Sequence, residues 1–178
     1  MRNQLYFPTN STKVHRDFFE RESSEVAMDL LGRVLVREQS GPNQYLRISE
    51  VAAYLGIVGE SMEEARNKNG NLFYAPGVIG ISSSHGHHLM DLGTLAHCEP
   101  SCITIIGGTL RTKDGAKEEI KGPGNITRRL GINSEYDSVP INFGQLWIGG
   151  SSIDREDIKS RRKSSAPENW SGTFYFKE

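Results

Sequence analysis

The chain has 178 residues, 36% of them hydrophobic, and its composition does not change abruptly along the sequence. That length suffices for one buried core, so we expect a single domain over residues 1–178 that starts with a polar arm at residues 1–15. Lysine and arginine number 21 against 22 aspartates and glutamates, and this net charge of -1 excludes a global attraction to polyanions. Any nucleic-acid binding must therefore come from a local patch.

The sequence lacks the features of membrane and secreted proteins. It contains no uninterrupted apolar stretch long enough to span a bilayer, and its first residues, MRNQLYFPTN, lack a charged-then-apolar secretion signal. Cys98 and Cys102 are the only cysteines, too few for a disulfide framework, so we expect reduced thiols. A soluble cytoplasmic or nuclear protein is the resulting prediction.

The first third of the chain predicts a short helix followed by a β-hairpin. In residues 22–32 the apolar side chains recur at helical spacing, and a glycine ends the pattern. Residues 33–38 alternate apolar and charged side chains, and after the turn signal SGPN residues 44–56 resume with β-branched and aromatic content. This pattern is typical of a hairpin whose second strand is long.

Side chains along the second hairpin strand should alternate between its two faces with a period of two. On that basis one face carries a set of five alternate residues, and the residues between them occupy the other face. The five are Leu46, Ile48, Glu50, Ala52 and Tyr54.

The remainder of the chain predicts further strands and one more helix. Residues 56–71 are polar and indicate a loop, whereas NITRRLG begins with an N-cap candidate and stops at a glycine, as a short helix does. Strands are predicted in VIGISSS with HGHHLMDLG, in CITIIGGTL, in INFGQLWIGG and in WSGTFYFKE. The total indicates an α+β domain with mainly antiparallel strands.

Several segments occur in the same order and at nearly the same spacing as in the alkyladenine (3-methyladenine) DNA glycosylases, and the chain resembles that family over most of its length. The segments are FFERESSEVAMDLLGRVLVRE, RISEVAAYLG, KNGNLFYAPG, SHGHHLMDLG, GPGNITRRLGI and TFYF. The resemblance implies a single domain with a curved sheet and short peripheral helices. It also implies a monomer that binds double-stranded DNA and needs no cofactor or metal.

Members of the family flip a damaged purine out of the duplex and hydrolyse its N-glycosidic bond with an activated water, without a lyase step. The strand that matches RISEVAAYLG carries the glutamate that activates the water, and Ala52 occupies that position here. Tyr54 matches the tyrosine that packs on the flipped base. Glu50 matches an earlier glutamate of the same strand and is a candidate base; the favoured alternative is a half-buried carboxylate paired with Arg47, Arg33 or backbone donors.

The second wall of the family pocket is also altered. Gly80, Ser82 and His85 stand at three tyrosine positions, of which the middle one stacks on the base and the last one wedges into the duplex. Leu92 stands at the position of an asparagine that excludes guanine, and Ile106 at that of an arginine that holds the water. Hydrolysis is therefore expected to be weak, altered or lost.

A cluster of histidines follows the serine run, and a metal site is disfavoured there because alternation on a strand would point neighbouring ligands to opposite faces. His85 and His88 are instead predicted to flank the pocket, with Asp91 as an alternative catalytic carboxylate, or to make ordinary hydrogen bonds at a strand end. The predicted base pocket comprises Ala52, Tyr54, Ser82, His88 and Leu92.

DNA contacts are predicted at two turns. His85 and Gly86 match the wedge region of the family, and Asn125 and Arg128 follow a GPGN turn whose backbone N–H groups suit a phosphate, although GPGN also fits a simple start of a helix. The sequence thus favours a diverged DNA glycosylase, with two alternatives: a noncatalytic module that binds nucleic acid or a nucleotide-like ligand, and a hydrolase of a small nucleoside-like substrate.

Overall fold

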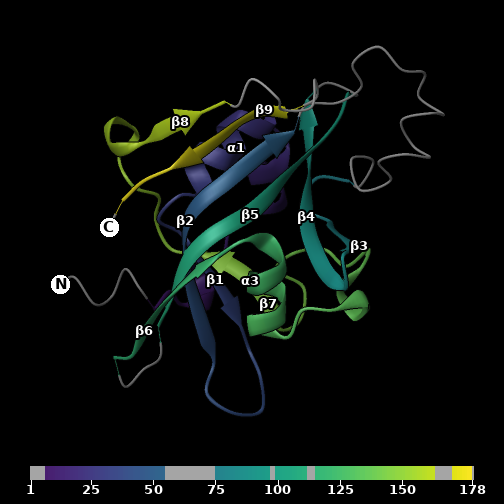
Figure 1. Cartoon of the computed structure of the whole chain (residues 1–178), viewed down its shortest axis with the longest axis vertical. Helices are drawn as coiled ribbons and strands as arrows, with labels where there is room; N and C mark the ends of the chain where they lie inside the picture. Colours follow the sequence, from purple (N-terminus) through teal and green to yellow (C-terminus); the bar gives the residue numbers. More distant parts are fainter. Residues whose placement is uncertain (1–6, 55–74, 97–98, 112–114, 163–169, 178) are drawn as a thin grey trace.

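The computed structural model describes residues 7–54, 75–96, 99–111, 115–162 and 170–177 (Figure 1). These residues form one sheet of nine strands together with two α-helices and four short 3-10 helices. The strands are β1 (Val34–Arg37), β2 (Gln44–Tyr54), β3 (Ile79–Ser84), β4 (His87–Ala96), β5 (Glu99–Arg111), β6 (Lys117–Lys121), β7 (Leu146–Gly149), β8 (Lys159–Arg161) and β9 (Trp170–Tyr175). The helices are α1 (Ser23–Leu30), α3 (Pro123–Leu130), η1 (Asn10–Thr12), η2 (Arg16–Phe19), η4 (Ser134–Tyr136) and η5 (Arg155–Asp157).

The long strands β2 and β5 form the centre of the sheet, and each changes its outer partner halfway along its length (Figure 1). The first half of β2 pairs with β1 and its second half with β9, while β5 pairs first with β4 and then with β6. All of these pairings are antiparallel. The sheet curls around the paired strands β2 and β5. This confirms the predicted α+β architecture with a curved antiparallel sheet.

A β-bulge interrupts β2 where its partners change. Register shifts flank Glu50, which lies opposite Gly107 of β5. A Cβ atom on Gly107 would lie 3.0 Å from the Cβ of Glu50 and 3.5 Å from the Oγ of Ser49, so both side chains project to the same side of the sheet. Two consecutive side chains on one side reverse the alternation. Ile48 before the bulge and Val51 after it consequently both lie in the core.

This bulge corrects the predicted alternation along β2. Unbroken alternation places Leu46 and Ile48 on the same face as Ala52, but both are fully buried in the main core cluster, to which Ala52 does not belong. Ala52 and Tyr54 keep their common face with Glu50, because these three residues follow the extra residue. The bulge therefore separates the apolar first half of the predicted face from its second half.

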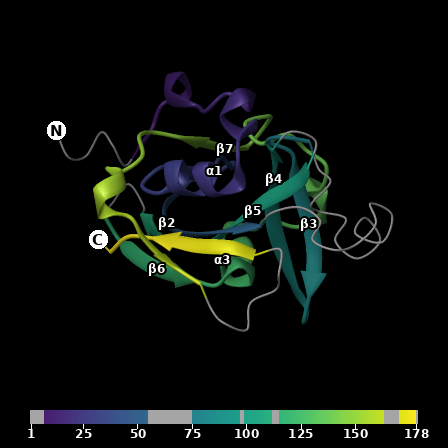
Figure 2. The same cartoon turned by 90° about the horizontal axis from the view of Figure 1, so that it is seen from above.

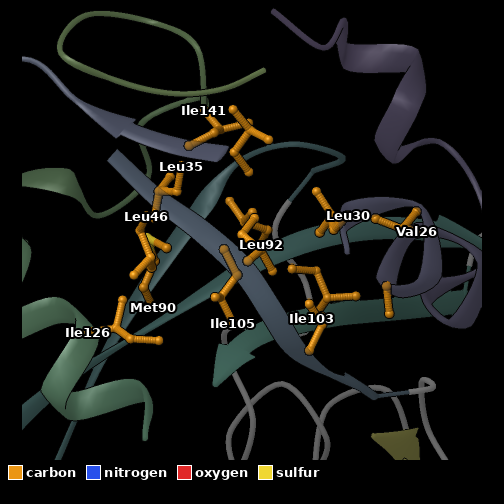
Figure 3. Packing of buried hydrophobic residues seen from close by; sticks show 14 of the residues in the cluster. Val26, Leu30, Leu35, Leu46, Met90, Leu92, Ile103, Ile105, Ile126 and Ile141 are labelled. Carbon is orange, nitrogen blue, oxygen red and sulfur yellow. The ribbon is translucent and has the colours of Figure 1, made fainter. Parts of the chain in front are cut away.

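A large part of the main core lies between α1 and the second half of β2 together with the first half of β5. Val26, Ala27 and Leu30 of α1 are fully buried and pack against these strands, as the helical spacing predicts. Figure 2 shows α1 on one side of the sheet, and Figure 3 shows Leu30 and Ile103 within the same buried cluster. The opposite face of these strands is therefore the one that Ala52 and Tyr54 occupy.

The described part of the predicted polar arm packs on the sheet. The backbone N–H of Val14 donates to the carbonyl of Ile148 at 3.0 Å, and Lys13 bridges to Gly149 of β7. The ring of Phe7 meets Tyr45 edge-on, with 4.8 Å between the ring centroids. Phe7 therefore covers the face of β1, β2 and β7 that points away from the main core, whereas Val14 joins the main core.

Two further features differ from the sequence-based expectations. The segments VIGISSS and HGHHLMDLG form separate strands, β3 and β4, that pair as a hairpin. Strand β6 forms from the charged residues KEEIK, in which only Ile120 is buried, so its sequence shows little of the pattern of a strand. Among the described residues, no helix is long and apolar enough to cross a membrane.

The close approach of β2 and β5 beside the bulge predicts the effect of a small substitution. A Cβ atom on Gly108 would lie 2.7 Å from the backbone oxygen of Arg47 and 2.8 Å from the Cγ of Leu46. Gly108→Ala should therefore lower the free energy of unfolding by about 1–3 kcal/mol in chemical denaturation. Gly41→Ala is the matched control, because a Cβ atom on Gly41 meets no atom within 4 Å. Equal stabilities of the two variants would contradict this register.

Candidate active site

One transverse row of residues crosses the sheet on the face opposite α1 and contains Ala52, the position at which the resemblance leads us to expect a glutamate. Residues that pair directly across antiparallel strands point to the same face. The row runs from β9 through β2, β5 and β4 to β3, and we call it the Ala52 row. Its members are Thr173, Ala52, Thr104, Asp91 and Gly80.

Asp91 is the one carboxylate of this row. Thr104, which is buried, lies between Ala52 and Asp91, and its Oγ1 donates a hydrogen bond to the Oδ1 of Asp91. Asp91 itself is half-buried. The structure thus places the candidate carboxylate Asp91 on the same face as Ala52, separated from it by a single strand.

Tyr54 and Cys102 form the adjacent pair on the same face. Burial raises the pKa of the Tyr54 phenol above its ordinary value, and the negative charges of Asp91 and of an ionised Cys102 raise it further. Burial also raises the pKa of the Cys102 thiol well above its ordinary value, with a further contribution from the charge of Asp91. Both groups are therefore protonated near neutral pH, and both are close enough to Asp91 to sense its charge.

Glu50 occupies the same face one step along β2, beside the bulge. Its carboxylate accepts a hydrogen bond from Nη2 of Arg161 on β8, and its side chain is only 18% exposed. The guanidinium of Arg161 also lies over the ring of Tyr175. The expectation of a paired carboxylate is confirmed, but the predicted partners are wrong: the side chains of Arg33 and Arg47 donate to backbone carbonyls in other directions.

The other predicted pocket residues fall on different surfaces. Leu92 is fully buried in the main core, where it pairs with Ile79 and Ile103. Its side chain therefore lies on the opposite face from Asp91 and does not line the predicted pocket. Ser82 lies two residues from Gly80 on β3 and shares the face of Asp91 by alternation. Ile106 is half-buried and lies on β5 next to Gly107, the residue opposite Glu50 at the bulge.

His85 and Gly86 form the two-residue tip of the β3–β4 hairpin. Ser84 pairs with His87 across the tip, and the φ angles of His85 and Gly86 are 49° and 79°. Positive φ at both central residues is the conformation of a type I′ turn, the turn that matches the twist of a hairpin. His85 is exposed, and its Nδ1 lies 2.9 Å from the Oγ of Ser84. The alternation assumed for the histidine cluster therefore does not apply across this turn.

His88 lies apart from the Ala52 row. It alternates with Met90, a core residue, and its backbone carbonyl accepts a hydrogen bond of 2.6 Å from Oγ1 of Thr127 in α3. Within the described residues, the buried Nδ1 of His88 has no hydrogen-bond partner. The structure thus brings His88 to α3 and not to the face of Asp91.

The start of α3 is the second turn at which DNA contacts are predicted, and its glycine Gly124 is buried. Gly122 precedes the helix with a φ of 91°, and Asn125 Nδ2 donates to the carbonyl of Lys121 at 2.8 Å. Arg128 Nη2 donates to Asn125 Oδ1 at 3.0 Å. Asn125 and Arg128 are both exposed, as contacts with a phosphate require.

The described residues contain no group of three or more histidine, cysteine, aspartate or glutamate side chains that could hold a metal ion. His97 and Cys98 of the histidine cluster lie outside these residues, as does the polar loop predicted at 56–71.

Sequence reasoning did not identify Thr104, Cys102 or Thr173 as site residues, and it placed Arg161 only within the basic stretch 159–163, which is interpreted as a solvated loop or as a phosphate-binding segment. Each belongs to the site only through pairing with a distant strand, and no local pattern in the sequence reports that pairing. Their residue types alone carry no signal of a site, because threonines and a lone cysteine are common in strands and Arg161 lies in a basic stretch typical of a solvated loop. The features together define a small α+β protein with a carboxylate-bearing row on one face of a curled sheet.

Comparison with known proteins identifies the family. The model of the family described as methylpurine-DNA glycosylase (MPG) matches residues 17–165. A protein of Anaeromyxobacter sp. (strain Fw109-5), named "Putative 3-methyladenine DNA glycosylase", is 33% identical over 156 residues, which cover 85% of this chain and 79% of the relative. A protein of Gloeobacter violaceus with the same name is 27% identical over 80% of this chain and 72% of the relative. The chain belongs to the methylpurine-DNA glycosylase family.

The coupling between Asp91 and Tyr54 predicts a change in the titration of the phenol. Removing the negative charge with Asp91→Asn should lower the pKa of Tyr54, while burial still keeps it above the ordinary tyrosine value of about 10. The absorbance of the tyrosinate measures this titration, and Tyr54→Phe identifies the contribution of Tyr54. An unchanged Tyr54 titration in Asp91→Asn would show that the two groups are not neighbours.

Proposed function

We propose that this protein acts in DNA repair as a methylpurine-DNA-glycosylase-like protein that binds double-stranded DNA and flips a damaged purine, with N-glycosidic hydrolysis weak, altered or lost at the family's usual position. Membership of the family and the names of its relatives support a glycosylase-like repair role. The observation that carries the finer proposal is the location of Ala52 in the Ala52 row, between Thr173 and Thr104. Strand β2 is retained at this position, whereas the carboxylate that the resemblance leads us to expect on it is absent.

The proposed pocket lies over the Ala52 row. Tyr54 supplies one aromatic wall, since it is half-buried on the same face as Ala52. Gly80 and Ser82 stand on β3, where the resemblance places aromatic residues, and neither fills the volume of an aromatic ring. A base bound here would therefore have one stacking partner from the described strands and more space on the side of β3.

The proposed DNA contacts come from the two turns. His85 at the hairpin tip is a flat, exposed side chain that suits the space left by an extruded nucleotide, and Gly86 lets the backbone approach. Asn125 and Arg128 at the start of α3 offer an amide and a guanidinium to a phosphate. Because the net charge is -1, such local contacts must supply the attraction to DNA. Extrusion costs on the order of a few kcal/mol, and it costs least for damaged or mispaired bases.

Restoring the carboxylate at the family position tests the proposal. Ala52→Glu should release methylated purines from duplex DNA at least tenfold faster than Ala52→Gln, because a general base contributes about 10²- to 10⁴-fold and the glutamine has the same size without the base. The measurement is a single-turnover assay on duplex DNA methylated with dimethyl sulfate, with binding followed in parallel at low salt.

Each other outcome has a distinct meaning. Equal rates for Ala52→Glu and Ala52→Gln would contradict a pocket centred on Ala52. Duplex binding without release by any form would favour the noncatalytic binding module. If no form binds duplex DNA above background at low salt, the proposed function fails, and a small nucleoside-like substrate becomes the better hypothesis.

A further inference from the structure

Strand β8 brings a cation to one end of the Ala52 row. Arg161 pairs with Thr173 of β9, and Thr173 pairs in turn with Ala52 of β2. Because residues that pair directly across antiparallel strands point to the same face, Arg161 faces the same side of the sheet as Ala52. Its carboxylate partner Glu50 lies on that side as well. The row therefore continues beyond Thr173 to an arginine.

The guanidinium of Arg161 is held in place and is still open to solvent. One of its N–H groups donates to the carboxylate of Glu50, and its central carbon lies 5.4 Å from the centroid of the Tyr175 ring. The side chain of Arg161 is nonetheless 51% exposed. A guanidinium carries several N–H donors, and within the described residues Glu50 is the hydrogen-bond partner of this one. Arg161 is therefore a fixed cation with donors left for an anion.

Lys159 adds a second cation on the same face of β8. It pairs with Tyr175, the residue opposite Glu50 on β9. Lys159 and Arg161 are two residues apart, so their side chains share a face at a spacing of about 6.6 Å along the strand. Lys159, Arg161 and Arg162 are all exposed. Strand β8 thus presents a local concentration of positive charge, although the whole chain has a net charge of -1.

Ion pairs fix β8 from both of its ends. Before its start, η5 is tied to α1, because Nη2 of Arg155 donates to Glu25 at 2.7 Å and to Asp29 at 2.9 Å. At its end, Arg161 is tied to Glu50. Figure 1 shows β8 beside β9 at the edge of the sheet. Because the cations of β8 are already ordered, an anion that binds them loses little free energy to ordering.

A basic edge strand also has a purely structural explanation. Lysine and arginine on an edge strand discourage pairing with another chain, and an ion pair open to solvent adds little stability. Neither role requires the cations to lie on a particular face. Lys159 and Arg161 both lie on the face that carries Ala52, which favours a ligand bound at that face.

We propose that β8 is a phosphate-binding edge for duplex DNA: Arg161, with Lys159 beside it, binds backbone phosphates next to the extruded nucleotide, at the end of the Ala52 row. This inference rests on the proposed function. Guanidinium and phosphate form charge-assisted hydrogen bonds that can pair side by side, whereas the negative charge of Glu50 opposes the approach of a phosphate. Duplex DNA thereby contacts the sheet at β8 as well as at the turns that carry His85 and Asn125.

Two matched pairs of variants test the inference through duplex binding. The first pair is Arg161→Gln and Glu50→Gln, in which the amide oxygen of the new glutamine can still accept the hydrogen bond of Arg161. The second pair, Arg16→Gln and Glu20→Gln, makes the same charge changes at an exposed ion pair of η2, which packs against α1. The probe is a duplex with one tetrahydrofuran abasic site, and its binding to the whole chain is measured by fluorescence anisotropy at several salt concentrations. Circular dichroism and thermal unfolding check that each variant is folded.

The two site variants should change binding in opposite directions. Arg161→Gln should weaken binding about three- to tenfold and reduce the salt dependence of log K by about 1, as the loss of one phosphate contact does. Glu50→Gln should tighten binding about two- to fivefold, because it removes a negative charge beside the phosphate and leaves Arg161 in place. Both η2 variants should stay within about twofold of the wild type, since charges separated by more than a Debye length are screened. A purely structural ion pair would make Arg161→Gln and Glu50→Gln equally harmful.

Uncharged linkages identify the phosphate that Arg161 contacts. One phosphate at a time on either side of the abasic site is replaced by a methylphosphonate, and each duplex is measured with the wild type and with Arg161→Gln. At a linkage beside the abasic site, the replacement should weaken binding of the wild type and leave that of Arg161→Gln unchanged. Such coupling is expected of two groups in contact.

Three results would overturn the inference and leave the proposed function in place. They are a folded Arg161→Gln that binds the duplex as well as the wild type, equal losses for Arg161→Gln and Glu50→Gln, and independent effects of Arg161→Gln and the methylphosphonate at every linkage. A wild type that does not bind the duplex at low salt would contradict the proposed function itself, and the inference would fall with it.

Discussion

The bulge in β2 is the constraint on which the rest of the structure depends. Ser49 and Glu50 project to the same side of the sheet, so the apolar side chains on either side of them, Ile48 and Val51, both reach the core. Without the extra residue, a continuous core would require Ala52 and Tyr54 to turn inward. The bulge thus lets one strand complete the core along its whole length and still present its second half on the opposite face.

The chemistry of the site follows from the row that the bulge creates. Ala52, Thr104 and Asp91 share a face because β2, β5 and β4 are paired in register there. Asp91 places a carboxylate on this face, one strand away from Ala52, and it accepts a hydrogen bond from Thr104.

Local sequence patterns predicted α1, the β1–β2 hairpin and the common face of Glu50, Ala52 and Tyr54. They did not reveal the bulge, because Ser49 and Glu50 carry no signal that distinguishes them from ordinary strand residues. The turn at the β3–β4 tip was missed because its first residue, His85, is not a glycine. The proximity of Asp91 to Ala52 depends on pairing between strands far apart in the sequence, which no local pattern reports.

The most direct test of this account is a crystal structure of the protein bound to duplex DNA that contains a stable cationic analogue of an abasic sugar. The account predicts that the analogue is extruded from the duplex over the Ala52 row, beside Tyr54, with His85 in the vacated stack. An analogue that stays within the helix, or that lies away from the Ala52 row, would contradict it.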